Sequence, residues 1–563
     1  MSTPKTGGRL VVDMLTSLGV EYVFGVVGGQ TLAITDALID TPGIELVHTR
    51  HENAAAVMMD AYGRLTGRPA ACISTTGPGA TNLLTGVGGA YRDSSPGFVI
   101  TCNNNGENIH KDDAQNADHV ELVKPLVKWS RLVAHGSSVK QAMEEAYVNC
   151  LTGNPGPVHL DFARDTIEGL IENPPQVPAV HPSRAWVTER PSANPVALTR
   201  VAERVLRAER PVIWLGNGGN RARAAEDVLA LADALGIPVV TTFNGIGSVP
   251  TTHPLVFGAV TRMGTALAGD VLADADLVLA LGNSLNAVST TRWRRALPEI
   301  VQVDVEPAMI GRYYSEITQG VVSDLGSFAR ALVTATAGHA EAARAGRAQW
   351  IAALDKARTA WWQGTDVADP GAEGPLSPAD VVRSLREVAP EDTLLIPDAG
   401  NPGVWSFLWE IQRPNSYIKP VGFGNMGFAL PSAIAASLID PERPVLALIG
   451  DGSLGMSLGE LETLARVGGN VCVVVLNDSS YGNIRQEQEL HFEGRTTGVD
   501  FGPVDFGMAA RAMGVPGEVV TGLSALRERV ADAFAAGGPV VLDVPIDREV
   551  NAWTFPAFTG GAK

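Results

Sequence analysis

Short runs of apolar residues alternate along the chain with glycine-rich turns and with stretches in which apolar residues recur at helical spacing. The clearest apolar runs, each with the turn that follows it, lie at residues 21–29, 70–79, 211–216, 277–282 and 445–450. Each run is long enough for one buried strand, and a helical pattern follows the turn. The alternation predicts an α/β fold of doubly wound parallel sheets with helices on both faces. Ligands of such sheets bind at the carboxyl ends of the strands, where these turns fall.

Two segments divide the chain into three parts. Residues 173–195 are rich in proline, and residues 365–378 are rich in proline, glycine and acidic residues, so neither segment suits a continuous helix or strand. We therefore predict three α/β domains and a short C-terminal tail, at residues 1–178, 190–340, 375–550 and 551–563. A surface helix is expected at residues 335–360, leading into the second linker.

Composition narrows the class of protein. The 563 residues are 45% apolar and 18% charged, with a formal net charge of −18, which argues against nucleic-acid binding because that needs clustered Lys and Arg. No apolar run approaches the ~20 residues that span a bilayer, and the first residues lack a signal or transit pattern. We expect a cytoplasmic protein that does not enter a membrane. The scattered cysteines have no metal-ligand spacing, and Cys72 and Cys472 are expected to be buried.

Polar residues follow two apolar runs of the third domain. The strand expected at residues 445–449 ends in a Gly-Asp-Gly-Ser turn at residues 450–453, and the strand expected at residues 471–476 ends at Asn477. One crossover helix joins these strands, so Asp451 and Asn477 should lie side by side at the same sheet edge. A carboxylate, an amide oxygen and a nearby carbonyl suit Mg²⁺ or Ca²⁺, with a diphosphate supplying further oxygens. The glycines allow close approach of the backbone, and the following helix offers N–H groups to phosphate.

This turn, followed by an asparagine at the next strand tip, resembles the signature of thiamine-diphosphate (ThDP) enzymes of the decarboxylase and acetolactate synthase superfamily. The resemblance implies ThDP and Mg²⁺ as cofactors, with the metal held by Asp451, Asn477 and the carbonyl of Ser479. Asp478 departs from the asparagine that many members have. Further cofactor contacts implied by the resemblance are Gly28, Asn401, Gly452, Ser453, Tyr481, Gly482 and Ile484.

Residues 422–431 resemble the segment that lies under the cofactor in this superfamily. The resemblance implies that Met426 separates the two rings of ThDP and enforces its bent shape. It also implies that the carbonyl of Gly424 accepts a hydrogen bond from the 4′-amino group. On its own, Met426 would instead be read as a core methionine.

The first domain supplies the candidate acid. The Arg-His-Glu sequence at residues 50–52 resembles the superfamily's catalytic segment, and the likeness continues through residues 61–64 and 74–82. It implies that Glu52 protonates N1′ of the aminopyrimidine ring, so that the 4′-nitrogen can remove the C2 proton. Gln115 is a second candidate catalytic residue. Because counterparts of Glu52 and Asp451 in one site come from different subunits in this superfamily, a homodimer is the expected minimum and a homotetramer the expected assembly.

The residues that would decide which reaction the protein catalyses differ between the first and the central domain. The first domain is most similar to acetolactate synthases, whereas the central domain lacks their lysine at residues 244–247 and their acidic pair at residues 284–287, which argues against a flavin and against acetolactate synthesis. Residues 302–311 and 486–494 look like those of acyl-CoA-cleaving enzymes, the second segment like actinobacterial 2-hydroxyacyl-CoA lyases. A short helix would carry Phe492 and Glu493 over the cofactor.

The leading interpretation is a lyase that cleaves a short 2-hydroxyacyl-CoA, such as 2-hydroxyisobutyryl-CoA, reversibly to formyl-CoA and a ketone or aldehyde. Glu493 would shuttle the proton, and Val127 and Phe492 would line the acyl pocket; Glu493 could equally be a solvated surface acid. The alternative is an acetolactate-synthase-like carboligase or a 2-oxoacid or oxalyl-CoA decarboxylase. A non-enzymatic subunit is disfavoured, because Glu52, Asp451 and Asn477 are all present. Candidate contacts for the phosphates of CoA are Arg292, Arg294, Arg295 and Arg312.

Overall fold

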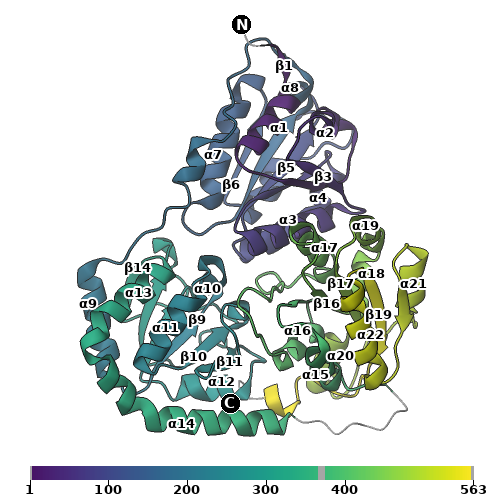
Figure 1. Ribbon diagram of the computed structural model, residues 1–563. Coiled ribbons are helices and arrows are strands. Elements are labelled where there is room, and N and C mark those ends of the chain that lie inside the picture. Colours follow the sequence, from purple (N-terminus) through teal and green to yellow (C-terminus); the bar gives the residue numbers. More distant parts are fainter. Residues whose placement is uncertain (1–2, 366–374, 559–563) are drawn as a thin grey trace.

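Three sheets of parallel strands organise the chain in the computed structural model, which describes residues 3–365 and 375–558. The first domain stands above the other two in Figure 1, with the central domain at the lower left and the third domain at the lower right. The three sheets fall inside the three predicted domain ranges. The predicted α/β fold with doubly wound parallel sheets is confirmed. Most of the predicted second linker, residues 366–374, lies outside the described residues.

The first domain contains a six-stranded sheet of order β3-β2-β4-β5-β7-β6. Its strands are β2 (Tyr22–Gly25), β3 (Glu45–His48), β4 (Ala70–Ser74), β5 (Gly97–Asn103), β6 (Trp129–Val133) and β7 (Pro157–Ala163). One face packs on α1 (Gly7–Ser17), α2 (Leu32–Ile39) and α7 (Val139–Leu151), and the other on α3 (Glu52–Thr66) and α5 (Leu84–Arg92). Shorter elements complete it: β1 (Lys5–Thr6), α4 (Pro78–Asn82), α6 (His119–Val123), α8 (Arg164–Glu168) and β8 (Leu170–Ile171).

The central domain contains a second six-stranded sheet, of order β11-β10-β9-β12-β13-β14. Its strands are β9 (Pro211–Leu215), β10 (Val239–Thr242), β11 (Val256–Val260), β12 (Leu277–Leu281), β13 (Glu299–Asp304) and β14 (Gln319–Val322). Its helices are α9 (Pro195–Arg207), α10 (Asn217–Ala222), α11 (Ala225–Leu235), α12 (Ala266–Ala273), α13 (Leu325–Thr336) and α14 (Ala340–Gly364). The predicted surface helix corresponds mainly to α14, which runs along the bottom of the molecule in Figure 1.

The third domain contains a five-stranded sheet of order β15-β16-β17-β19-β18. Its strands are β15 (Leu394–Pro397), β16 (Val445–Gly450), β17 (Val471–Asn477), β18 (Gly517–Val519) and β19 (Val540–Pro545). Its helices are α15 (Pro378–Val388), α16 (Asn401–Trp405), α17 (Ala429–Ile439), α18 (Asp451–Ser457), α19 (Glu460–Val467), α20 (Gly482–His491), α21 (Phe506–Ala512) and α22 (Leu523–Ala536). The described part of the tail packs back on this domain, where Phe558 contacts the rings of Trp405 and Phe407.

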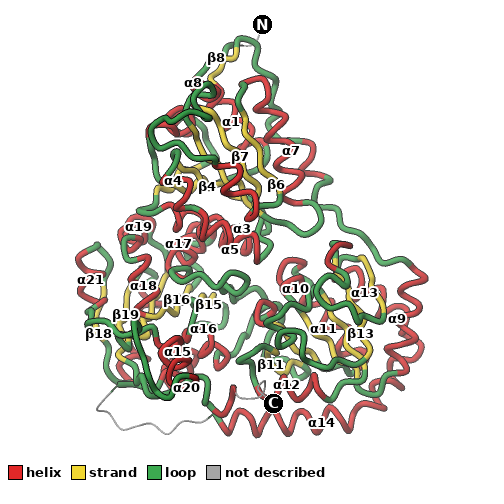
Figure 2. Tube along the Cα trace, turned by 180° about the vertical axis from the view of Figure 1, so that it is seen from behind, coloured by secondary structure: helices red, strands yellow, loops and turns green. Residues whose placement is uncertain are grey.

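The first and third domains share one hydrophobic core. Helix α17 packs against α3, and side chains such as Met58 of α3 and Ile434 of α17 belong to the same buried cluster. Figure 2 shows α17 beside α3 and α5, where the first and third domains meet. This shared core fixes the relative position of the two domains that carry the candidate cofactor residues.

The remaining expectations on composition concern cysteines and membranes. Cys72, Cys102, Cys150 and Cys472 are all buried, as predicted for Cys72 and Cys472, and they form no disulfide. Across residues 3–365 and 375–558, no helix combines the length and apolar character needed to cross a membrane.

Candidate cofactor site

Asp451 and Asn477 lie at the ends of neighbouring strands. β16 and β17 are parallel, with Gly450 opposite Leu476, so the two polar residues follow adjacent strand ends as the sequence predicts. Asp451 is 3% exposed; its Oδ1 accepts a hydrogen bond from the N–H of Gly452 at 2.7 Å. Its Oδ2 is buried and has no partner at hydrogen-bonding geometry in the described chain. Burial, with the nearby Asp478 carboxylate, raises the pKa of Asp451 to about 7. A divalent cation would satisfy the free oxygen and favour the ionised carboxylate.

The amide of Asn477 is held in one orientation. Its Nδ2 donates to the carbonyl of Val504 at 3.0 Å and to Oδ1 of Asp543 at 2.9 Å, so the other end of the amide, Oδ1, is the end that can bind a cation. Ser479 adopts a left-handed backbone conformation with φ +53°. The described residues hold no cluster of three or more His, Cys, Asp or Glu side chains that suits a metal. A metal here would therefore need amide and carbonyl oxygens, which is the predicted donor set.

Asp543 was not identified from the sequence. It lies in β19, is buried, and its other oxygen accepts the N–H of Phe506 at 2.8 Å. Burial raises the pKa of its carboxyl group. The signal that could have found it is an acidic residue inside an apolar strand, since such a residue is rarely buried without a partner.

Helix α18 begins at the candidate metal site and presents its first N–H groups at the sheet edge. A Cβ atom built on Gly452 would lie 2.7 Å from the Tyr481 ring and 3.5 Å from Cε of Met426. Three of the predicted cofactor contacts, Gly452, Tyr481 and Met426, are therefore brought together by the fold. Ser453 is buried in the same first turn.

Replacing Gly452 with Ala tests how tightly this group is packed. We expect the Tyr481 ring to be displaced, because contacts below 3.0 Å cannot be kept, and we expect ThDP affinity to fall about tenfold, equivalent to about 1.4 kcal/mol. Gly455→Ala in the same helix is the matched control, since its Cβ would meet nothing within 4 Å. Calorimetric titration with ThDP and Mg²⁺ measures both variants; equal affinity of Gly452→Ala and wild type would contradict the expectation.

Asp398 holds the segment that carries Met426. It follows β15 and is fully buried, with Oδ1 accepting the N–H of Gly427 at 3.1 Å and Oδ2 accepting the N–H of Ala429 at 2.7 Å. Burial raises the pKa of Asp398 to about 6. Met426 itself is half-buried, and Gly424 is exposed with φ +72°. Asp398 is a second supporting residue that the sequence did not single out, although it follows a strand at the ligand-binding edge.

Both ends of the Asn401 side-chain amide form hydrogen bonds within the protein. Its Oδ1 accepts from Nδ2 of Asn483 at 2.9 Å, and its Nδ2 donates to Oε1 of Gln486 at 3.2 Å. The side chain therefore ties α16 to α20, and the second hydrogen of its Nδ2 is left to donate to a diphosphate. Gly482 begins α20, and Ile484 is half-exposed on the same helix.

The first domain holds Glu52 at the start of α3. Nδ1 of His51 accepts the N–H of Asn53 at 3.0 Å, which caps the helix, and Glu52 accepts a hydrogen bond from Asn82 at 3.0 Å. Glu52 is half-buried. Gln115 is exposed with φ +59°, and its carbonyl lies 3.4 Å from Oγ1 of Thr76. Gly28 packs against Thr75, a neighbour of this loop.

The predicted substrate residues are not assembled in the single chain. The helix expected to carry Glu493 ends earlier, at His491, because the backbone becomes left-handed at Glu493 and Gly494 (φ +56° and +77°). Phe492 is 56% exposed and Glu493 is exposed. Val127 is 6% exposed and packs in the core shared by the first and third domains. Their roles at a substrate stay predictions.

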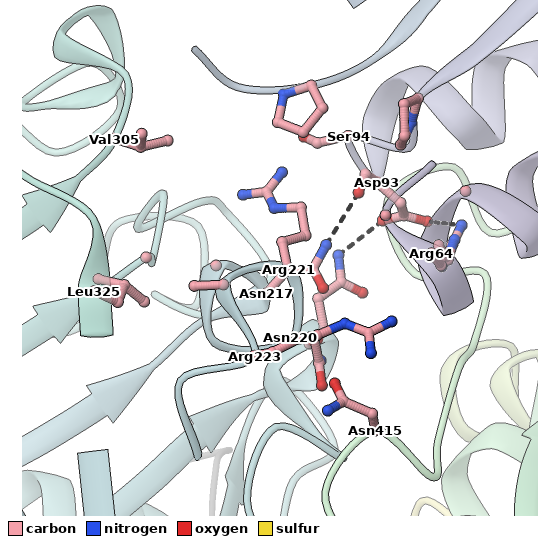
Figure 3. Close-up of a pocket in the computed structure, with 18 of the residues that line it drawn as sticks. Arg64, Asp93, Ser94, Asn217, Asn220, Arg221, Arg223, Val305, Leu325 and Asn415 are labelled. Carbon is pink, nitrogen blue, oxygen red and sulfur yellow. Dashed lines mark hydrogen bonds and ion pairs between the residues drawn. The ribbon is translucent and has the colours of Figure 1, made fainter. Parts of the chain in front are cut away.

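A cavity of about 130 Å³ lies where the three domains meet, at the carboxyl ends of β9, β12 and β13. Figure 3 shows Arg221 and Arg223 of the central domain on one side and Asp93 and Arg64 of the first domain on the other. Arg221 is half-buried and donates to Oδ1 of Asn154 at 2.6 Å. Arg221 and Arg223 follow the glycine-rich turn after β9, which could have identified them. Of the arginines predicted to contact CoA, Arg312 lines an adjoining hollow, whereas Arg292, Arg294 and Arg295 line neither space.

Comparison with known proteins agrees with the three-domain arrangement. Residues 5–122 match the N-terminal TPP binding domain of thiamine pyrophosphate enzymes, residues 198–332 match their central domain, and residues 398–544 match their C-terminal TPP binding domain. Thiamine pyrophosphate is another name for ThDP. The first two matches contain Glu52 and the cavity arginines, and the third contains Asp451 and Asn477.

Several relatives are similar over nearly their whole length. A probable acetolactate synthase large subunit of Methanocaldococcus jannaschii is 30% identical over 96% of this chain and 92% of its own. An acetolactate synthase large subunit of Parasynechococcus marenigrum is 32% identical over 98% and 90%, and an acetolactate synthase of Mycobacterium bovis is 30% identical over 98% and 90%. With full-length relatives at this identity and all three domains matched, the chain belongs to the family of thiamine-diphosphate-dependent enzymes.

Proposed function

We propose that this protein is a ThDP- and Mg²⁺-dependent carboligase that decarboxylates a 2-oxoacid such as pyruvate and joins the remaining fragment to a second 2-oxoacid. The observation that carries the proposal is the full-length similarity to acetolactate synthases across all three domains. The relatives support the carboligase better than the 2-hydroxyacyl-CoA lyase, so the carboligase, which was the alternative from the sequence, becomes the leading interpretation. The departures at residues 244–247 and 284–287 concern the central domain, so they leave the cofactor residues untouched.

The arrangement of this chain's residues supports specific roles. ThDP, when bound, supplies the carbon nucleophile and the electron sink. Asp451, the amide oxygen of Asn477 and the carbonyl of Ser479 would hold the metal, and the first N–H groups of α18 would bind the diphosphate. Met426, placed by Asp398, would support the rings.

Glu52 would hold a proton at N1′ of the aminopyrimidine, at the capped start of α3. Because this role and that of Asp451 are expected to come from different subunits in one site, we propose a homodimer as the smallest active form, with a homotetramer as the expected assembly. Gln115, exposed in the single chain, is proposed to contact substrate or cofactor across this interface.

The lyase interpretation has less support. It depends on Glu493 as a proton shuttle, and Glu493 lies beyond the end of α20 in a left-handed conformation. Its predicted pocket partner Val127 is buried in a hydrophobic core. An acyl-CoA substrate and the proton-shuttle role therefore remain the alternative.

One assay separates the two reactions. Purified protein with ThDP and Mg²⁺ is supplied with pyruvate in one vessel and with 2-hydroxyisobutyryl-CoA in another, and acetolactate and formyl-CoA are quantified. We expect acetolactate from pyruvate, and we expect Glu493→Gln to retain nearly the full rate because the exposed side chain has no part in carboligation. If the wild-type protein released formyl-CoA and made no acetolactate, and if Glu493→Gln no longer released formyl-CoA, the carboligase proposal would be rejected in favour of the lyase.

A further inference from the structure

Helix α19 of the third domain contacts the turn of the first domain that leads into Glu52. This turn, residues 48–51, joins β3 to α3. At the first residue of α19, the carboxylate of Glu460 accepts the N–H groups of Arg50 and His51, each at 3.0 Å to Oε1. Its Oε2 accepts the hydroxyl of Thr463 at 2.7 Å, and Glu460 is 2% exposed. The carboxylate is therefore fully used, and two backbone donors of the turn depend on it.

The far end of α19 holds the other end of the same turn. Nη2 of Arg466 donates to the carbonyl of His48 at 2.7 Å. Directly before α19 the two segments are also close, since a Cβ atom on Gly459 would lie 3.3 Å from Cβ of Arg50. The turn is thus fixed at both ends by a helix of another domain, in addition to its own strand and helix.

The position of this turn sets the position of Glu52. His51 is the N-cap of α3 and Glu52 is the first helical residue, so the two N–H groups bound by Glu460 belong to Glu52's immediate predecessors. These N–H groups precede the helix and take no part in its ladder. With Gln in place of Glu460, the one remaining oxygen would carry no charge, so its hydrogen bonds to the N–H groups of Arg50 and His51 would weaken and the turn would be held less firmly.

We propose that Glu460 is a positioning residue for Glu52: the third domain places the catalytic acid by binding the backbone directly before it. The inference rests on the cofactor role assigned to Glu52 within the proposed function. Its consequence is that the geometry of the acid is set by α19, which follows the cofactor-binding helix α18 directly in the chain.

The test uses the holoenzyme and follows exchange of the C2 proton of bound ThDP by NMR after acid quench, a readout that needs no substrate. Glu460→Gln is expected to slow exchange about 10–100-fold, since misplacement of a catalytic group by about 1 Å has effects of this order. ThDP affinity should change little, because Asp451 and Asn477 are untouched. Glu442→Gln, at an exposed position of the same domain, is the matched control and should exchange at the wild-type rate.

A double substitution separates positioning from a general loss of structure. In the Glu52→Gln background, adding Glu460→Gln should slow exchange no further, because Glu460 acts through Glu52. Glu460→Asp, which keeps the carboxylate on a shorter side chain, should recover part of the rate and provides a folded variant if Glu460→Gln is unstable.

Exchange at the wild-type rate in Glu460→Gln would overturn the inference. So would a Glu460→Gln substitution that slows exchange equally in the wild-type and Glu52→Gln backgrounds. Exchange at the wild-type rate in Glu52→Gln would overturn it as well. If the protein makes no acetolactate but Glu460→Gln slows exchange only when Glu52 is present, the positioning role stands and the carboligase proposal fails.

Discussion

Glu52→Gln is expected to slow exchange of the C2 proton of bound ThDP by about 10²–10⁴-fold, the range over which a positioned acid or base contributes to a proton transfer. The amide cannot give a proton to N1′ of the aminopyrimidine, so the 4′-nitrogen would not become basic enough to remove the C2 proton. The change is nearly isosteric, and the hydrogen bond from Asn82 can be kept by the amide oxygen. NMR of acid-quenched samples gives the exchange rate directly.

The control for this prediction is cofactor retention. Glu52 lies in the first domain, whereas the predicted metal ligands lie in the third, so Glu52→Gln should bind ThDP together with Mg²⁺ with nearly wild-type affinity. Exchange at the wild-type rate in a variant that binds the cofactor normally would remove Glu52 from the mechanism.

Asp451→Asn is expected to abolish the stabilisation of the protein by ThDP and Mg²⁺. Wild-type protein at a cofactor concentration of about 100 Kd should gain about 2.7 kcal/mol in the free energy of unfolding, because only the folded chain binds the cofactor. The variant lacks the charged oxygen at the metal position and should show almost no gain. Thermal unfolding with and without ThDP and Mg²⁺ measures this, and Asp440→Asn on the exposed surface is the matched control.

Without cofactor, the ionised carboxylate of Asp451 lowers the stability of the folded protein, which is opposite to its effect when the cofactor is bound. Burial raises the pKa of its carboxyl group from 3.8 to about 7, so the folded state favours the protonated form. This contribution to stability is present below about pH 4 and is lost as the pH rises through about 7. The apo form of Asp451→Asn should therefore lose less stability than apo wild type between pH 5 and 8.

A cofactor-induced stabilisation of the variant equal to that of wild type would contradict the assignment of Asp451.

The sequence predicted those features that depend on short stretches of chain. Asp451 and Asn477 follow apolar strands joined by one crossover, and parallel strands place their carboxyl ends at one edge, so their proximity followed from local pattern alone. The glycine beside Asp451 was expected to let the backbone approach a phosphate, and its close contact with the Tyr481 ring was not foreseen.

Contacts between distant segments could not be predicted in this way. The partners of Asp398 are backbone N–H groups of residues 427 and 429, and those of Glu460 belong to the first domain. A backbone N–H is the same in every residue except proline, so the sequence carries no mark of which one a carboxylate will bind.

The substrate assignment rested on the weakest kind of pattern. By resemblance, a short helix was expected to carry Phe492 and Glu493, but Gly494 favours a left-handed backbone and the helix ends before both residues. Val127 could not be recognised as buried, because the core that covers it is completed by α17 of another domain.

The most direct measurement of the cofactor assignment is a crystal structure of the protein with ThDP and Mg²⁺. We predict a metal ion bound by a carboxylate oxygen of Asp451, Oδ1 of Asn477 and the carbonyl of Ser479, with the diphosphate at the start of α18 and Met426 under the rings. A metal bound elsewhere, or a cofactor that leaves Oδ2 of Asp451 without a partner, would contradict this account.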